Sequence, residues 1–530
     1  MIRSIIRISV FLLACGEGWV SLAQPAPATR DEVERLKQQV AGQQEQINEL
    51  RRLLEGQQTL PRAPQGTSSP PAIQRPAPAE ATQTSPLPRD SAPPKAPLSL
   101  EVGGAAITPT GWLDFTQVWR SKTVTSGLPT NFAGIPFNNT VDGHRRQTLS
   151  SAANSRMGVR IDTKAFGFKV LGVVETDFLG YAPGNVSTTT NSNGMRLRLA
   201  FTDLHKGKWE VLGGQSWSLI TPSRKGISPL GSTLFLTQDL DPNIMTGLTW
   251  ARTPQVRVVY HPKESIALGV SFESANAYAG GSSGSGASTL PSALAPNYFG
   301  QIDTGGGGLG VPNANADLLA KIAFDPKLGD RSIHFEVAGL INRFTFYNPL
   351  NNQRFTKVGA GVAVNAGIEA VRHLTFFTNN FYSDGGGRFV FGQGPALIIR
   401  GDGAPSLVHT MATVDGFEYQ ATPKWKLFAY YGGTYVGRNV TIDPASGNPV
   451  GYGYPGSPNS HNKSIQEIAG GFQHVFWHNP NYGAFQFNGQ YSWLVRHPWY
   501  VAPNQPKSAN LNMLYLNIRY LLPGEPPASK

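Results

Sequence analysis

The chain has almost no cysteine and, after its N-terminus, no long apolar run. The single cysteine among its 530 residues is Cys15, so we expect a mature protein without disulfides. No run of about 18 apolar residues follows the N-terminal segment, which argues against membrane-spanning helices. Charged residues are scarce as well, at 15% of the chain.

Motifs for catalysis and metal binding are nearly absent too. Residues 280–284 match G-x-S-x-G, but they lie in a Gly/Ser run without the strand and helix that would expose the serine. Asp303-Thr304-Gly305 has the form of an aspartic-protease turn without a second copy. The ten histidines form no i, i+3 or i, i+4 pair on a plausible ligand face. We therefore predict no enzyme, no cofactor and no metal site; an outer-membrane hydrolase is an alternative for which no Ser–His pair stands out.

Glycine and aromatic residues are abundant instead. The chain has 59 glycines, 27 phenylalanines, 17 tyrosines and 10 tryptophans. This composition favours many strands with glycine-rich loops and interfacial aromatic side chains over a helical globule. The formal net charge of +11 falls mostly after residue 100 and forms no Lys/Arg cluster. It indicates an anion-attracting surface or channel, with no nucleic-acid partner.

The most informative stretch runs from Ser155 to Trp217. Its segments SRMGVRID (155–162) and MRLRLAFTD (195–203) alternate apolar and polar residues, which is the pattern of strands with one apolar and one polar face. A soluble sandwich would bury the apolar face. A transmembrane barrel turns that face toward lipid and the arginines opposite it toward a water-filled lumen. The rest of the chain favours the barrel.

Similar segments recur to the end of the chain. We predict an all-β transmembrane barrel of about 16 antiparallel strands, because segments of roughly 9–11 residues fit a tilted crossing and an even number keeps both barrel ends on the periplasmic side. Short turns alternate with long loops, as at the two ends of a barrel. The predicted strands are 111–120, 155–162, 168–178, 195–203, 209–217, 252–260, 265–273, 317–324, 332–342, 361–370, 374–382, 411–420, 424–433, 464–476, 482–494 and 511–520.

The first residues have the pattern of an export signal. Residues 1–23 are predicted to be a signal peptide, since basic residues precede an apolar core and Ser21-Leu22-Ala23 offers a small-x-small cleavage site. A lipoprotein signal at Leu12-Leu13-Ala14-Cys15 is the alternative. With either signal, we expect the chain to be exported.

Three further segments follow the signal peptide. Residues 31–58 are predicted to be a periplasmic coiled coil and residues 59–100 a Pro-rich, extended, semi-rigid linker. The barrel is assigned to 101–522 and a C-terminal tail to 523–530. Spacings of three and four residues define the seam of the coiled coil: Val33, Leu36, Val40, Gln43, Ile47, Leu50 and Leu54.

Basic residues repeat on the lumen-facing parity of the predicted strands. Arginine stays charged, and its planar guanidinium group can bind carboxylate or phosphate through two hydrogen bonds. Rings of Arg or Lys favour anions in pores. A structural interpretation is equally open, in which acidic residues pair with these cations and stiffen the wall; the candidate acids are Asp162, Glu175, Asp177, Glu336 and Glu369. The basic residues, named the basic ladder below, are Arg156, Arg160, Arg196, Arg198, Arg257, Lys426 and Arg519.

The long loop after the fifth predicted strand is a candidate constriction. Loops of barrels can fold into the lumen and narrow it, and residues 218–250 form such a long connection. A surface loop is the alternative. The charged residues of this loop that we expect at a constriction are Arg224, Lys225, Asp239 and Asp241.

Four short runs add to the layout of the predicted segments: SRMGVR (155–160), VETDF (174–178), RLR (196–198) and GQSWS (214–218). In this layout and these runs the chain resembles the DcaP-like family of outer-membrane channels. The resemblance implies a trimer of sixteen-stranded barrels with a periplasmic coiled coil, passing small organic anions such as dicarboxylates. The related phosphate-selective porins O and P imply phosphate instead. Barrels of this kind usually end on an aromatic residue. This chain departs from that pattern, because a Pro-rich tail follows Tyr520.

Together these features predict a porin of the bacterial outer membrane. We expect a homotrimer in the lipid bilayer, which passes small hydrophilic solutes by passive diffusion and favours anions such as dicarboxylates. One alternative is a phosphate-selective channel. Another is an envelope tether, in which the barrel only anchors a coiled coil and a linker, and these two segments hold the cell wall.

Overall fold

The structure is a computed structural model that describes residues 98–523, apart from 125, 181–193, 231–233, 240–242, 283, 306–314 and 327–328. The chain divides into two units, residues 1–90 and 91–530, and every described residue belongs to the second unit. The predicted signal peptide and coiled coil, almost all of the predicted linker and most of the predicted tail therefore lie outside the described residues.

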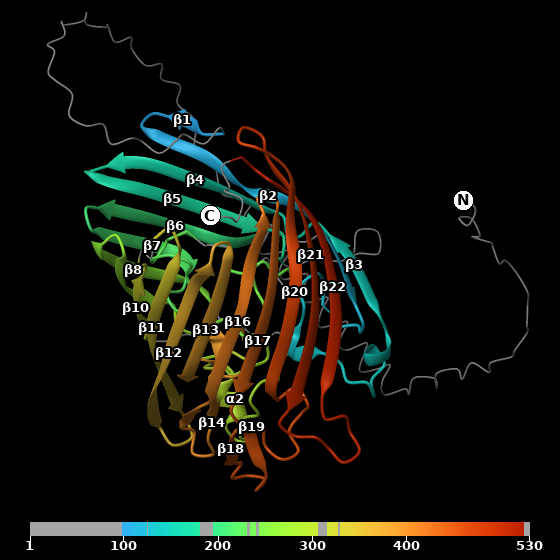
Figure 1. The fold of residues 1–530 in the computed structure, drawn as a ribbon. Coiled ribbons are helices and arrows are strands. Elements are labelled where there is room, and N and C mark those ends of the chain that lie inside the picture. The colour runs from blue at the N-terminus through green and yellow to red at the C-terminus, as the bar shows by residue number, and fades with distance from the viewer. Residues whose placement is uncertain are drawn as a thin grey trace, which may run out of the picture. The chain divides into compact units, whose positions relative to one another are not determined.

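The described part of the chain is an antiparallel barrel (Figure 1). Its main sheet has 18 strands, of which β1 and β3 pair only with β2 and the other 16 form the ring. The ring closes because β2 pairs with β22 on one side and with β4 on the other. Each predicted strand corresponds to one strand of this ring, so the predicted sixteen-stranded barrel is confirmed.

The strands of the ring are β2 (Ala105–Arg120), β4 (Arg156–Ala165), β5 (Phe168–Asp177), β6 (Arg196–Lys206), β7 (Trp209–Trp217), β8 (Arg252–Lys263), β9 (Ile266–Glu273), β10 (Asp317–Phe324), β11 (Ile333–Asn348), β12 (Gln353–Val371), β13 (Leu374–Asp384), β16 (His409–Thr422), β17 (Trp425–Val436), β20 (Asn462–Asn479), β21 (Gly483–Pro498) and β22 (Ala509–Leu521). The remaining elements are short and are β1 (Leu100–Val102), β3 (Gln147–Ser151), β14 (Leu397–Ile399), β15 (Pro405–Leu407), β18 (Asn439–Ile442), β19 (Pro449–Tyr452), α2 (Ala295–Tyr298), η1 (Phe132–Gly134), η2 (Asp142–His144) and η3 (Gly387–Phe389).

Successive side chains of a strand point alternately to the outside of the barrel and to its lumen. On β22, Leu514, Leu516 and Ile518 are exposed on the outer face, whereas the alternate residues Tyr515 and Arg519 are buried inside. The outer face is therefore apolar and suits lipid, and polar side chains line the interior. No helix in the described residues is long and apolar enough to span a membrane.

The two ends of the barrel differ in their connections. At one end the strands join through tight turns, such as the β4–β5 turn, where Phe166 (φ 51°) and Gly167 (φ 77°) adopt the positive φ values of a two-residue hairpin. Long loops gather at the other end, where Figure 1 places β14, β18, β19 and α2.

Two strands are longer than the sequence pattern predicted. We expected strands to end at 342 and begin at 361, but β11 and β12 stay paired out to Asn348↔Gln353. Their extension is held by packing, because Phe344 and Phe346 of β11 are buried against residues of the loops 274–316 and 385–408. A membrane-length rule does not anticipate such pairing beyond the bilayer.

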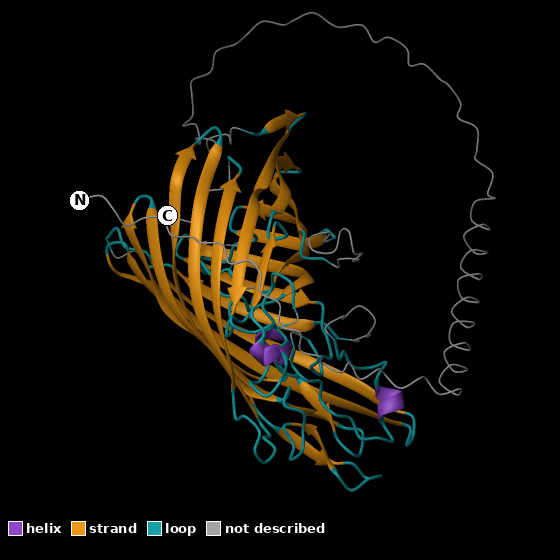
Figure 2. Cartoon of the chain, turned by 90° about the vertical axis from the view of Figure 1, so that its right-hand side faces the viewer, coloured by secondary structure: helices purple, strands orange, loops and turns teal. Residues whose placement is uncertain are grey.

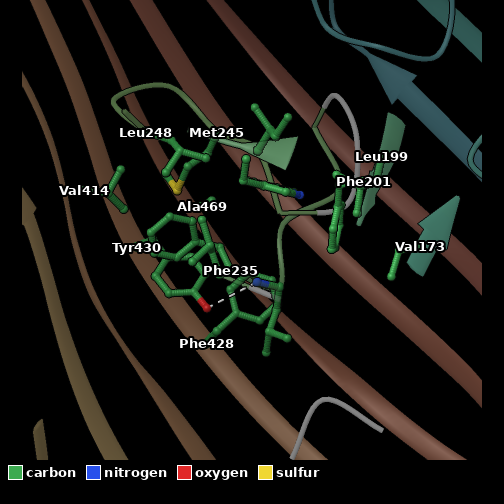
Figure 3. Close-up of a cluster of buried hydrophobic side chains, with 14 of the residues drawn as sticks. Val173, Leu199, Phe201, Phe235, Met245, Leu248, Val414, Phe428, Tyr430 and Ala469 are labelled. Atoms are coloured by element: carbon green, nitrogen blue, oxygen red, sulfur yellow. Dashed lines mark hydrogen bonds between the residues drawn. The ribbon is translucent and has the colours of Figure 1, made fainter. Parts of the chain in front are cut away.

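One long loop crosses the lumen. Residues 218–251 connect β7 to β8 and are called the inner loop below. Its residues Phe235 and Met245 pack in one cluster with Phe201 of β6 and with Phe428 and Ala469 of β17 and β20 (Figure 3). Since β6 and β17–β20 lie on opposite sides of the ring, the inner loop bridges the two walls. Figure 2 shows the loop segments inside the ring of strands.

Candidate functional site: the lumen wall and the inner loop

Three arginines of the basic ladder share two carboxylates on the neighbouring strand. Arg196 binds Asp177 with Nε (3.0 Å) and Nη2 (2.6 Å). Arg198 reaches both Glu175 (Nε to Oε1, 2.7 Å) and Asp177 (Nη1 to Oδ2, 2.8 Å), and its side chain is 1% exposed. Arg156 lies 3.7 Å from Glu175. These interlocked pairs arise because β4, β5 and β6 place residues of one parity on the same face.

A tryptophan joins this cluster to the closure of the barrel. The ring of Trp112 has the guanidinium group of Arg156 4.1 Å from its centroid and that of Arg519 at 4.8 Å. Arg519 also binds Asp114 (Nε to Oδ2, 2.9 Å) and Gln238 of the inner loop (Nη2 to Oε1, 3.1 Å). Cation–π contacts and ion pairs therefore connect β22, β2 and β4 into one charged wall.

Two members of the ladder keep a large exposed area. The Arg160 side chain is 41% exposed and pairs with Asp162 two residues along the same strand (2.7 Å). The Arg196 side chain is 34% exposed although it is bound to Asp177. Both guanidinium groups are accessible to a solute as well as paired.

Arg257 differs from the rest of the ladder. Its side chain is buried, and within the described residues its Nε and Nη2 atoms have no hydrogen-bond partner. Asp203, Glu210 and Glu273 act on it electrostatically. Arg257 therefore lies in a polar but net acidic part of the wall, which does not favour an anion.

The four residues predicted for a constriction differ in their outcomes. Arg224 anchors the inner loop to β16 through Glu418 (Nη1 to Oε2, 3.1 Å), and Glu418 also lies 3.7 Å from Lys426 of the ladder. Lys225 is exposed. Asp239 is fully buried and accepts hydrogen bonds from the barrel wall, and Asp241 lies outside the described residues.

One important charged residue was not predicted. Lys321 of β10 is buried, and its Nζ donates to Glu336 (3.0 Å) and to the carbonyl oxygen of Thr221 in the inner loop (2.7 Å). Glu336 was a candidate partner of the ladder and pairs with Lys321. Glu369, another candidate partner, accepts the backbone N–H of His373 (2.8 Å) at a tight turn. Lumen parity could have identified Lys321, which alternates with exposed apolar residues along β10.

Neither metal ligands nor a catalytic constellation stands out in the described residues. They contain no group of three or more His, Cys, Asp or Glu side chains that could hold a metal ion. The geometry is that of a lumen with ion-paired walls and a loop held across it.

A solved structure of an outer-membrane channel shares this fold. The DcaP outer-membrane channel of Acinetobacter baumannii has a TM-score of 0.56 and 18% identity, with 80% of this chain and 99% of that chain covered. The chain has the fold of the DcaP channel. OmpT of Vibrio cholerae (TM-score 0.42, 11% identity, coverage 80% and 99%) and the anion-selective porin of Comamonas acidovorans (TM-score 0.42, 11% identity, coverage 79% and 100%) are more distant. The sequence matches no protein-family model and no curated protein.

The DcaP-like fold confirms the predicted resemblance at the level of architecture. The inner loop contains the residues predicted for a constriction, and that role stays a prediction. The predicted relation to phosphate-selective porins stays a prediction.

Proposed function

We propose that the chain is an outer-membrane porin, a passive diffusion channel for small hydrophilic solutes. The observation that carries this proposal is the inner loop, which crosses the lumen of a closed barrel and binds both walls. An anchor needs only an apolar outer face, whereas a loop folded into a polar lumen sets the width of a passage. Transport then needs no covalent chemistry.

We further propose that the passage favours anions such as dicarboxylates. On the wall formed by β2, β4–β6 and β22, five ladder arginines face four carboxylates, those of Asp114, Asp162, Glu175 and Asp177. Among these groups, the arginines outnumber the carboxylates by one. Arg160 and Arg196 are the accessible cations of this wall, and the exposed Lys225 adds another on the inner loop. Guanidinium groups already oriented by carboxylates offer fixed donors to a passing anion.

A homotrimer is part of the same proposal. The seam predicted in residues 31–58 would join chains whose barrels already associate. Chemical cross-linking of the purified protein, with and without those residues, tests it. We expect trimers with the full chain and fewer of them after the deletion; monomers in both cases would refute the assembly.

Swelling of proteoliposomes tests the channel and its preference. We expect faster swelling in succinate than in a neutral solute of similar size, with phosphate at high concentration competing weakly. Arg160→Gln combined with Arg196→Gln should remove the preference for succinate. Arg331→Gln, a charge change at an exposed turn, is the matched control and should leave it unchanged. Equal swelling by the unmodified chain and the double variant would refute the role of these arginines, and strong inhibition by phosphate would favour a phosphate channel.

A further inference from the structure

Two carboxyl groups meet where the inner loop contacts the barrel wall. Asp239 belongs to the inner loop and Glu467 to β20, and both are fully buried, at 0% exposure. The two carboxyl groups act on each other directly, and Ser492 of β21 interacts with both. Because an ionised carboxylate only accepts hydrogen bonds, a hydrogen bond between the two groups needs one shared proton.

The other oxygen atoms of the pair fasten the loop to the wall. Asp239 Oδ1 accepts hydrogen bonds from Gln490 Nε2 (2.7 Å) and Ser492 Oγ (3.2 Å) of β21. Glu467 Oε2 accepts the backbone N–H of Thr246 (3.0 Å), which lies further along the inner loop. Asp239 Oδ2 and Glu467 Oε1 accept no hydrogen bond from any group of the described residues. A proton shared between the two carboxyl groups would supply the hydrogen bond that these buried oxygens lack.

The surrounding charges do not replace that proton. Arg120 of β2 and Tyr515 of β22 act on Asp239 electrostatically. Arg120 donates hydrogen bonds to the carbonyl oxygens of Gly127 (3.0 Å) and Leu128 (2.6 Å), and Tyr515 donates to the carbonyl oxygen of Asp239 and not to its carboxylate (2.9 Å). Loss of the proton would leave two negative charges side by side in a buried place, which is strongly unfavourable.

We propose that Asp239 and Glu467 form a pH-sensitive latch, which holds the inner loop across the lumen while one proton is shared and releases it when that proton is lost. Burial raises the pKa of Asp239 above its ordinary value. The pKa of Asp239 is higher when the loop is held than when it is released. A rise in pH from the ordinary pKa to the raised one therefore weakens the preference for the held loop. The ratio of held to released loop falls about tenfold per pH unit in that window for one proton. A wider passage at alkaline pH is the consequence if the proposed channel function holds.

Hydrogen–deuterium exchange of the purified full chain tests the latch without requiring conduction. Exchange at residues 243–248, which include the Thr246 amide, is measured from pH 5 to pH 9 and corrected for intrinsic rates. We expect protection to be lost as the pH rises. Glu467→Gln should keep its protection, since its amide group donates the hydrogen bond at every pH; Asp239→Asn supplies the same neutral pair if that variant does not assemble.

A second buried carboxylate of the inner-loop contacts serves as the control. Glu273 accepts the backbone N–H of Leu219 (2.9 Å) and the hydroxyl groups of Ser271 and Thr253. Glu273→Gln should leave the alkaline loss of protection in place. Protection that is independent of pH in the unmodified chain, or lost equally in Glu467→Gln, would overturn the latch. Because exchange is read from the loop itself, these outcomes are distinct from failure of the channel function, which conductance measures.

Discussion

Replacing Arg198 tests whether the basic ladder builds the wall as well as attracting anions. Arg198 is 1% exposed and is bound to both Glu175 (2.7 Å) and Asp177 (2.8 Å). Arg198→Gln removes the cation that the buried Asp177 and the half-buried Glu175 share. Breaking a buried ion pair on one side costs about 3–5 kcal/mol. Arg156 and Arg196 still lie near the two carboxylates, so we expect a loss at the lower end, about 3 kcal/mol.

Arg196→Gln is the matched comparison. Arg196 binds the same carboxylate, Asp177, but its side chain is 34% exposed, and Arg198 remains to neutralise Asp177. Solvent screening then reduces the cost to about 1 kcal/mol or less. The assay is equilibrium unfolding in guanidinium chloride of the barrel reconstituted in lipid vesicles, followed by tryptophan fluorescence. Equal losses in the two variants, or a loss below about 1 kcal/mol for Arg198→Gln, would refute the structural role of the buried arginine.

Two further predictions concern the hold on the inner loop, and both are checked by single-channel conductance and by the same unfolding assay. Phe235→Ala should cost about 3–5 kcal/mol in loop packing and raise conductance, because Phe235 is 2% exposed and its ring centroid lies 5.1 Å from that of Tyr430; unchanged conductance would contradict the bridge. Gly247→Ala should lift the loop from the wall, because Gly247 has φ +86° and an added Cβ would lie 2.1 Å from the carbonyl oxygen of Thr413. Gly226→Ala is the control, since Gly226 has φ +53° and the atom nearest to an added Cβ is 3.9 Å away. If both variants changed conductance and stability equally, backbone strain alone would explain the result of Gly247→Ala.

Much of the architecture follows from period-2 patterning. Alternation decides which side chains face lipid, so the strands and the lumen parity of Arg156, Arg196 and Arg198 are predictable from local sequence. Their partners on β5 are also local, because hairpin pairing fixes the register of neighbouring strands. The length of the connection 218–251 was enough to mark it as a candidate constriction.

The contacts across the lumen are not predictable in this way. Asp239 was expected among constriction charges, and its burial against Glu467 and Gln490 depends on how a loop packs on strands far along the chain. Parity shows that Lys426 faces inward but not that Glu418 and Arg224 lie beside it. Such contacts depend on three-dimensional packing of a long loop, for which a sequence period carries no information.

The most direct test of the account is conductance of the purified full chain in a planar bilayer under a salt gradient. The account predicts stepwise openings and a reversal potential of the sign given by anion selectivity, because the proposed passage runs beside the exposed Arg160 and Arg196. Steps in groups of three would support the proposed trimer. A bilayer that stays silent at every pH tested would contradict the channel, and a cation-selective reversal potential would contradict the role of the accessible arginines.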